Sequence, residues 1–201
     1  MKLYHSPLSP YVRKVVVTAT ELGLMDRIEV ASIASTPLDT DPGLIQDNPV
    51  GRIPALVTAE HGTLMDSRVI CRYLNSLAGG SLHGSGDGEW PIIAREALAE
   101  GMIDSALLCA YEGRFREENM RNQAWVDAQR AKVLRGCQGF EARIGEMGGE
   151  LTIDKIALGC AMGYIDFRLA DLGWRDSCPN LSKWAEEFSA RPSMQATAPQ
   201  A

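Results

Sequence analysis

Residues 48–56 read NPVGRIPAL, and this stretch decides how the first part of the chain must fold. Proline lacks an N–H for a sheet ladder, so Pro54 suits the start of a strand and not its interior. Cis peptide bonds are essentially a proline feature, and a cis Ile53–Pro54 bond forms a turn that leaves the preceding backbone groups exposed. We therefore predict this bond to be cis, with Ile53 offering its N–H and C=O to a peptide ligand as an added strand does.

The residues that follow predict a hairpin and then a helix. Residues 55–59 and 63–65 have the composition of two short strands around a turn at His61-Gly62. Asp66 and Ser67 then supply helix-opening side chains. The apolar face of this helix consists of Val69, Ile70, Tyr73, Leu74 and Leu77.

The residues upstream predict a β-α-β unit. Residues 2–5 and 27–33 are short β-prone runs, and apolar side chains recur at helical spacing between them. Ser9 can cap this helix, Pro10 fits its first position and Gly23 can close it. Residues 1–78 therefore have the predicted order β-α-β-irregular-β-β-α.

Composition changes after residue 78. The five glycines within residues 79–88 indicate a flexible linker, which we place at residues 79–90. Residues 91–201 predict only helices, the first starting at Pro91. Further helices are expected over 122–147 and 153–171, and a last one from Pro179 with Leu181, Trp184 and Phe188 on one face.

Bulk composition excludes several classes of protein. The formal net charge of −6 and the lack of a basic cluster argue against a nucleic-acid partner. No long apolar run or signal peptide is present, so we expect no membrane association and a cytoplasmic location. The five scattered cysteines form no Cys-x-x-Cys pair, which favours reduced core thiols over disulfides or a metal site. A small-molecule partner is expected.

Two helix starts have the chemistry to bind a zwitterionic ligand. Ser6 and Ser9 lie between the first strand and the first helix, where unpaired N–H groups and the helix dipole favour an anion such as a thiolate. The helix start at Ser67 can receive a carboxylate, while Asp66 can accept from an ammonium group. Serine and aspartate are also common helix caps, and that simpler role stays open for each of them.

These motifs together resemble the glutathione transferases, particularly their bacterial branches. The resemblance rests on SPLSPYVRK at 6–14, NPVGRIPAL at 48–56, MDSRVICRYL at 65–74 and the ending from Trp184 to Ser193. It implies a thioredoxin-like α/β glutathione-binding domain at 1–78, the linker at 79–90 and an all-helical domain at 91–201. It also implies glutathione as co-substrate, a small electrophile as second substrate and a homodimer.

The resemblance assigns roles to single residues. Ile53 and the cis Pro54 would pair with the cysteinyl backbone of glutathione. Asp66 and Ser67 would hold its γ-glutamyl end, and Arg52 would lie near the glycyl carboxylate.

Ser9 is the candidate to face the glutathione sulfur, with Ser6 as its rival. Cysteine-type members have a nucleophilic Cys at the position before the proline, and a serine there cannot form a mixed disulfide. Glutaredoxin-like reduction is therefore disfavoured. Tyr4 is the candidate for the tyrosine of tyrosine-type members, but its position favours an ordinary strand residue.

The electrophile pocket is expected between the domains, on topology alone. Its expected lining is Leu8, Tyr11, Met102, Ala106, Cys109 and Tyr111. Glutathione-dependent isomerases or dehalogenases, a non-enzymatic binding protein and a thiol reductase remain alternatives on the same fold.

One position departs from the family pattern. Lys155 stands where an Asp three residues after Thr152 would complete a capping box at the start of a core helix. Either Asp154 compensates from the adjacent position or Thr152 caps alone. An Asp at 155 is then expected to raise stability.

Overall fold

The computed structural model describes residues 1–199, and its first part is a four-stranded sheet with three helices. The sheet order is β2-β1-β3-β4; β1 runs parallel to β2 and antiparallel to β3, and β3 pairs antiparallel with β4. This is a thioredoxin-like arrangement. Its elements are β1 (Lys2–His5), α1 (Pro10–Glu21), β2 (Glu29–Ser32), α2 (Pro42–Asp47), β3 (Ala55–Thr58), β4 (Gly62–Leu64) and α3 (Ser67–Leu77).

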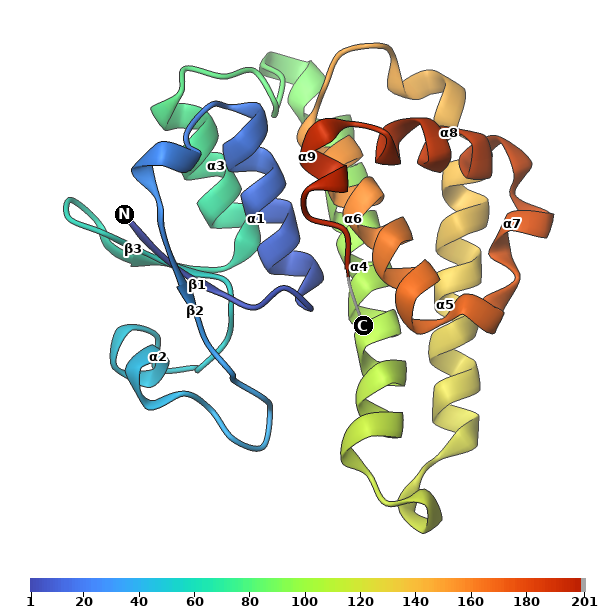
Figure 1. The fold of residues 1–201 in the computed structure, drawn as a ribbon. Helices are drawn as coiled ribbons and strands as arrows, with labels where there is room; N and C mark the ends of the chain where they lie inside the picture. Colours follow the sequence, from blue (N-terminus) through green and yellow to red (C-terminus); the bar gives the residue numbers. More distant parts are fainter. Residues whose placement is uncertain (200–201) are drawn as a thin grey trace.

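The second part is helical throughout the described residues. Figure 1 shows α4 and α6 beside α1, with α5, α7 and α8 farther from the sheet. Its helices are α4 (Glu89–Phe115), α5 (Gln123–Glu141), α6 (Ile153–Arg168), α7 (Trp174–Ser177), α8 (Pro179–Ser189) and α9 (Pro192–Gln195). None of the helices in residues 1–199 is both long and apolar enough to cross a membrane.

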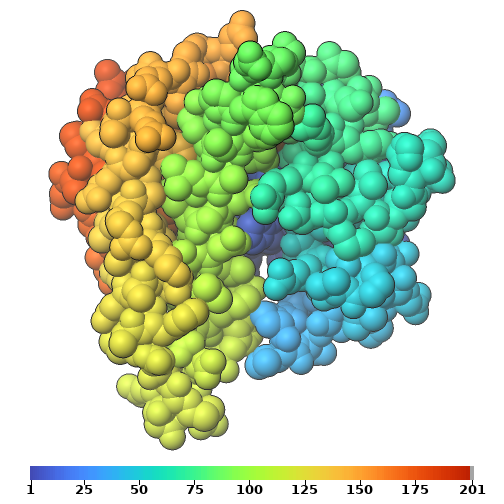
Figure 2. All heavy atoms as spheres, turned by 180° about the vertical axis from the view of Figure 1, so that it is seen from behind, coloured from blue at the N-terminus to red at the C-terminus, as the bar shows by residue number. Residues whose placement is uncertain are grey.

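A hollow separates the two parts on one side of the molecule. Figure 2 shows it between the green helix α4 and the cyan to teal segment before and within α3. Blue atoms from the start of the chain form its floor. The turn from β1 into α1 therefore lies where both parts can reach it.

The local signals in the first part predicted its four strands and the helices α1 and α3, but not α2. Ser9 caps α1, its hydroxyl oxygen accepting from the Val12 N–H at 3.3 Å, and Gly23 ends the helix with φ +67°. The Ile53–Pro54 bond is cis, as predicted, and Met65–Asp66 is also cis. Asp66 caps α3 through Oδ1, which accepts from the Arg68 N–H at 2.9 Å.

Several boundaries in the second part differ from the prediction. α4 begins at Glu89, two residues before Pro91. The helices expected to reach 147 and 171 end at Glu141 and Arg168 and continue only as short 3-10 turns. The helix from Pro179 is not the last, because Pro192 opens α9. Two other short helices, α2 and α7, were not predicted, since four to six residues carry too little periodicity.

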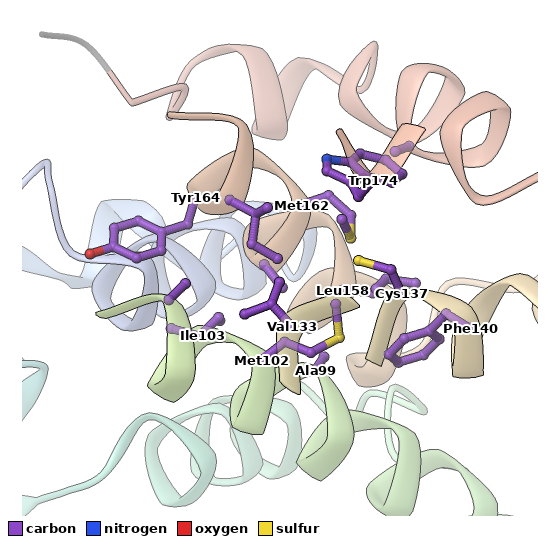
Figure 3. Packing of buried hydrophobic residues seen from close by; sticks show 14 of the residues in the cluster. Ala99, Met102, Ile103, Val133, Cys137, Phe140, Leu158, Met162, Tyr164 and Trp174 are labelled. Carbon is purple, nitrogen blue, oxygen red and sulfur yellow. The ribbon is translucent and has the colours of Figure 1, made fainter. Parts of the chain in front are cut away.

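The hydrophobic core has two main clusters, and one of them crosses between the parts. Figure 3 shows the first, where Ile103 and Met102 of α4, Val133 and Cys137 of α5 and Leu158 of α6 pack together. The second joins Leu3, Val15 and Ile70 of the α/β part to Ile156 and Cys160 of α6. The two parts therefore share a continuous apolar interface. All five cysteines are buried and unpaired.

The glycine-rich segment is anchored to both parts of the molecule. Leu82 and His83 are each 5% exposed, and Leu82 belongs to the shared core. The Leu82 N–H donates to the Asn75 side chain at 3.0 Å, and the Leu82 carbonyl accepts from Ile153 N–H at 2.8 Å. Leu82 and His83 therefore fix the middle of the segment expected to be a flexible linker, while residues 84–88 are exposed.

Neither expected substitute for the capping box exists at the start of α6. The Thr152 hydroxyl makes no cap bond, and Asp154 pairs instead with Arg95 at 2.5 Å. Lys155 donates from Nζ to the carbonyls of Gly148, at 2.8 Å, and of Glu150. The lysine thus secures the loop that leads into the helix, a role the capping-box pattern did not predict.

Candidate functional site

Dark-blue atoms from the start of the chain form the floor of the hollow (Figure 2), and Tyr11 at the start of α1 contacts Asp104 of α4. The Ser9 N–H donates to the Ser6 carbonyl at 3.1 Å, which closes the tight turn from β1 into α1. The Ser9 oxygen accepts from Val12 N–H, so its own O–H proton is left to donate. Ser6 lies in the same turn and is also partly exposed. An anion placed here would meet a hydroxyl donor and the positive end of a helix.

The loop before β3 is held by the side chain of Asn48, which is 1% exposed. Its Nδ2 donates to the Arg52 carbonyl at 2.7 Å and its Oδ1 accepts from Val50 N–H at 3.1 Å. Gly51 has φ +66°, and a Cβ there would come within 2.6 Å of the Thr40 methyl group. These restraints fix the backbone of Ile53 and Pro54, and the exposed Arg52 side chain lies at the rim.

The start of α3 is tied to the helical part through one carboxylate. The Ser67 hydroxyl donates to Glu100 Oε1 at 3.1 Å, and Arg68 Nε lies 2.6 Å from Glu100 Oε2. Asp66 is largely exposed, and one of its carboxylate oxygens accepts the capping hydrogen bond of α3. The Ser67 N–H lies in the first helical turn, where no internal partner exists. The structure therefore brings Asp66, Ser67 and Glu100 together.

Glu100 also belongs to a buried ion cluster. Lys14 of α1 is fully buried and pairs with Glu96 at 2.9 Å and with Glu100. The two carboxylates hold the pKa of Lys14 above its usual value despite the opposing effect of burial. The cluster fixes α1, α3 and α4 relative to one another, and so fixes the two helix starts that face the hollow.

Three of the six residues expected to line the electrophile pocket lie in the hydrophobic core instead. Met102, Ala106 and Cys109 lie in the core of the helical part, exposed by 2%, 0% and 7%, and do not face the hollow. Met102 packs against Gly136 of α5, and Cys109 Sγ lies 3.7 Å from the Val126 carbonyl. Helical spacing identified buried positions on α4 but could not tell which of its faces meets the hollow.

Leu8, Tyr11 and Tyr111 stay candidates for the lining of the electrophile pocket. Leu8 is half-buried in the turn before α1, and the Tyr11 hydroxyl donates to Asp104 of α4. Burial and this contact raise the pKa of Tyr11. Burial also raises the pKa of Tyr111, against the nearby positive charges of Arg114 and Arg52. Tyr111 lies two turns after Asp104 on the same face of α4.

Tyr4 is a strand residue, as its position favoured. It is 5% exposed, and its hydroxyl donates to the Gly43 carbonyl and to Asp47 Oδ2, at 3.0 and 2.7 Å. Lys2 donates to the same hydroxyl at 2.9 Å. Tyr4 therefore secures α2 and lies away from the turn at Ser9.

Glu100 and Asp104 are the site residues that the sequence did not reveal. Both are acidic residues on a long helix, where a solvated surface position is the ordinary expectation. Their spacing of four placed them on one helix face, but only the packing of α4 against α1 shows that this face meets the site. Within residues 1–199, no group of three or more His, Cys, Asp or Glu side chains has a metal-binding arrangement.

Comparison with known proteins agrees with this geometry. Residues 8–77 match the model of the glutathione S-transferase N-terminal domain and residues 123–187 that of the C-terminal domain. The chain is 32% identical over 206 residues to an uncharacterized GST-like protein, YibF, of Escherichia coli strain K12, covering 99% of this chain and 98% of that protein. The chain belongs to the glutathione S-transferase family.

Solved structures from one organism are similar over the whole chain. A glutathione transferase family member from Pseudomonas fluorescens Pf-5 with bound glutathione is 40% identical, with a TM-score of 0.96 and coverage of 100% of this chain and 99% of that one. Another from Pseudomonas fluorescens Pf-5, with bound S-(propanoic acid)-glutathione, is 38% identical, with a TM-score of 0.92 and full coverage of both chains. The fold is that of glutathione transferases.

Proposed function

We propose that this chain binds glutathione in the hollow, stabilises its thiolate and directs it at a small electrophile. The observation that carries this proposal is the capped start of α1, where the Ser9 hydroxyl accepts from Val12 N–H and keeps a proton to donate. A Pseudomonas fluorescens relative that shares 40% identity was solved with bound glutathione, which supports the same ligand here.

Each part of glutathione has a partner in this proposal. The backbone of Ile53, presented beside the cis Pro54, pairs with the cysteinyl residue. The first turn of α3 at Ser67 receives the γ-glutamyl carboxylate, and the exposed oxygen of Asp66 accepts from the ammonium group. Arg52 lies near the glycyl carboxylate.

Thiolate stabilisation is the chemical contribution of Ser9. The sulfur loses its proton to water, and the anion is held by the Ser9 O–H and the positive end of α1. The sulfur then attacks the electrophilic carbon, a C–S bond forms and the leaving group departs with its electron pair. A serine cannot supply the mixed disulfide that a thiol reductase needs.

Binding and turnover measurements test this proposal together. We expect millimolar or tighter glutathione binding by calorimetry, turnover of 1-chloro-2,4-dinitrobenzene above the uncatalysed rate, and little reduction of a mixed disulfide of glutathione. Binding without either activity would favour a non-enzymatic role. Disulfide reduction as the dominant activity would contradict the role of Ser9.

The family resemblance also supports a homodimer. Two-fold dimers are, in addition, the commonest form of soluble oligomer. Light scattering on the purified protein tests this assembly directly. A cytoplasmic location fits the five unpaired buried cysteines, since disulfides are rare in reducing compartments.

A further inference from the structure

The wall of the hollow opposite Ser9 is formed by successive turns of α4. Lys14 contacts Glu100, and Tyr11 contacts Asp104, so α4 runs past the start of α1 with its later residues beyond Ser9. Positions three, four and seven residues on share one helix face. Tyr111 therefore follows Asp104 on the face that meets the hollow, and Arg114 lies one turn farther on.

α6 brings a second set of side chains to the same place. A side chain at Gly163 would collide with the Arg13 guanidinium, so α1 lies directly against α6 there. Tyr164 of α6 belongs to the core cluster and is 3% exposed, and Figure 3 shows its hydroxyl directed away from Val133 and Cys137. Burial raises the pKa of Tyr164 to about 12, while the nearby charges of Arg168 and Arg114 act to lower it. Arg168 follows Tyr164 by one turn on the same face of α6.

Some arginines in the described chain pair with a carboxylate, and others, such as Arg27, Arg121, Arg135 and Arg143, form no such pair. Arg68, Arg95, Arg175 and Arg191 each pair with a carboxylate. Among residues 1–199, no ion pair with a carboxylate forms at three arginines beside the hollow, which are Arg52, Arg114 and Arg168.

Arg168 also has a guanidinium N–H group without an acceptor in the described chain. Its Nε is buried and has no hydrogen-bond partner in the described chain, although its guanidinium lies 4.2 Å from the Phe167 ring centre. A buried N–H without an acceptor is unfavourable, and a planar guanidinium matches a carboxylate with two parallel bonds. Asp104, the carboxylate on this wall, is occupied by the Tyr11 hydroxyl.

We propose that the electrophile carries a carboxylate, which Arg168 binds with help from Arg114, while Tyr11 and Tyr111 enclose its reactive end. This inference rests on the proposed function, because the wall faces the sulfur position only if glutathione occupies the hollow. Arg52 is already assigned to the glycyl carboxylate, so Arg168 and Arg114 supply the positive charge for the second substrate.

A matched pair of conjugates tests the carboxylate without requiring turnover. S-(2-carboxyethyl)glutathione and S-(2-carbamoylethyl)glutathione have nearly the same shape and differ in one negative charge. Calorimetry on the full chain would measure both, together with glutathione itself. We expect the carboxylate to bind at least tenfold more tightly than the amide.

Substitutions then test whether Arg168 is the source of the preference for the carboxylate conjugate. Arg168→Met should weaken the carboxyethyl conjugate about tenfold and leave glutathione and the amide within twofold, because an interaction with a charged group is lost. Arg168→Lys should restore part of the preference. Arg143→Met, at an exposed arginine outside the hollow and without a paired carboxylate in the described chain, should change neither conjugate.

Two results would overturn the inference. Equal binding of the two conjugates by the wild-type chain would remove the carboxylate preference, and equal weakening of both by Arg168→Met would reduce Arg168 to a structural role. Glutathione binding without a preference defeats only this inference. Failure of all three ligands to bind defeats the proposed function as well.

Discussion

The Ser67 hydroxyl donates to Glu100 Oε1 across 3.1 Å, and this bond joins the α/β part to the helical part beside the proposed glutathione site. The same carboxylate pairs with Arg68 and with the buried Lys14. The first turn of α3 is therefore positioned by a residue of α4. Binding of the γ-glutamyl end then depends on how the two parts pack, as well as on the residues that would contact it.

Replacing Ser67 with Ala should raise the KM for glutathione about fivefold or more and change kcat by less than twofold. The Ser67 hydroxyl holds the first turn of α3 in place through Glu100, and the contacts of that turn to the head group are similar before and during the reaction, so loss of the hydroxyl affects binding more than turnover. Steady-state kinetics with varied glutathione would measure both constants. Ser76→Ala, at an exposed serine near the end of the same helix, is the control. A fall in kcat alone would refute the assignment.

Glu100 acts on the site through Ser67 and Arg68, which makes it a positioning residue. Glu100→Gln should raise the KM for glutathione by several-fold, because an amide cannot accept from three donors at once. A double-mutant cycle with Ser67→Ala measures the coupling. We expect the effect of Glu100→Gln on KM to shrink in the Ser67→Ala background. Fully additive effects would show that Glu100 does not work through Ser67.

The pairing of Glu21 with Arg191 should make the docking of α9 sensitive to acid. Arg191 donates to both carboxylate oxygens at 3.0 and 2.8 Å, and these bonds hold the pKa of Glu21 below its usual value of 4.5. A lowered carboxyl pKa adds stability that is complete above the unfolded pKa and is lost as the pH falls through the folded one. The pair is partly exposed, so Glu21→Gln should cost about 1 kcal/mol at pH 7.

Urea unfolding of the wild type and Glu21→Gln from pH 3 to pH 8 would check this prediction. The difference in free energy of unfolding should stay constant above about pH 5 and shrink below about pH 4.5. A difference that stays unchanged down to pH 3 would rule out this ion pair as its source.

The capping-box pattern predicted that an Asp at position 155 would raise stability, and the contacts of Lys155 in the structure now predict the opposite. Its ammonium group binds the carbonyls of Gly148 and Glu150, so Lys155→Met should lower stability by about 1–3 kcal/mol. Lys155→Asp should lower it further, since a second carboxylate would stand beside the buried Asp154. Thermal unfolding of both variants checks the order. A gain in midpoint for Lys155→Asp would restore the capping-box interpretation.

Side chains that cap or break a helix predicted more of this structure than the spacing of apolar residues did. Ser9, Pro10 and Gly23 each act within a turn of their own position, so the bounds of α1 followed from the sequence. The partner of Ser67 lies 33 residues away on a helix whose rotation the sequence does not specify. For the same reason Met102 had the right spacing for a buried face but the wrong face for the pocket. Contacts between distant elements need the packed structure.

The central claim is that the Ser9 hydroxyl stabilises the glutathione thiolate, and the pH dependence of kcat tests it most directly. A thiol pKa of about 8.5 leaves little thiolate at neutral pH. A hydrogen bond to a charged group contributes about 1.5–3 kcal/mol, which lowers that pKa by about one to two units.

The measurement is kcat from pH 5.5 to pH 9.5 for the wild type, Ser9→Ala and Ser6→Ala, with saturating glutathione. For Ser9→Ala we predict a loss of about tenfold near pH 7 that narrows as the pH rises and the thiol ionises unaided, with glutathione affinity nearly unchanged. Ser6→Ala should follow the wild type. A Ser9→Ala profile that coincides with the wild type, beside a shifted Ser6→Ala profile, would contradict the claim and transfer the role to Ser6.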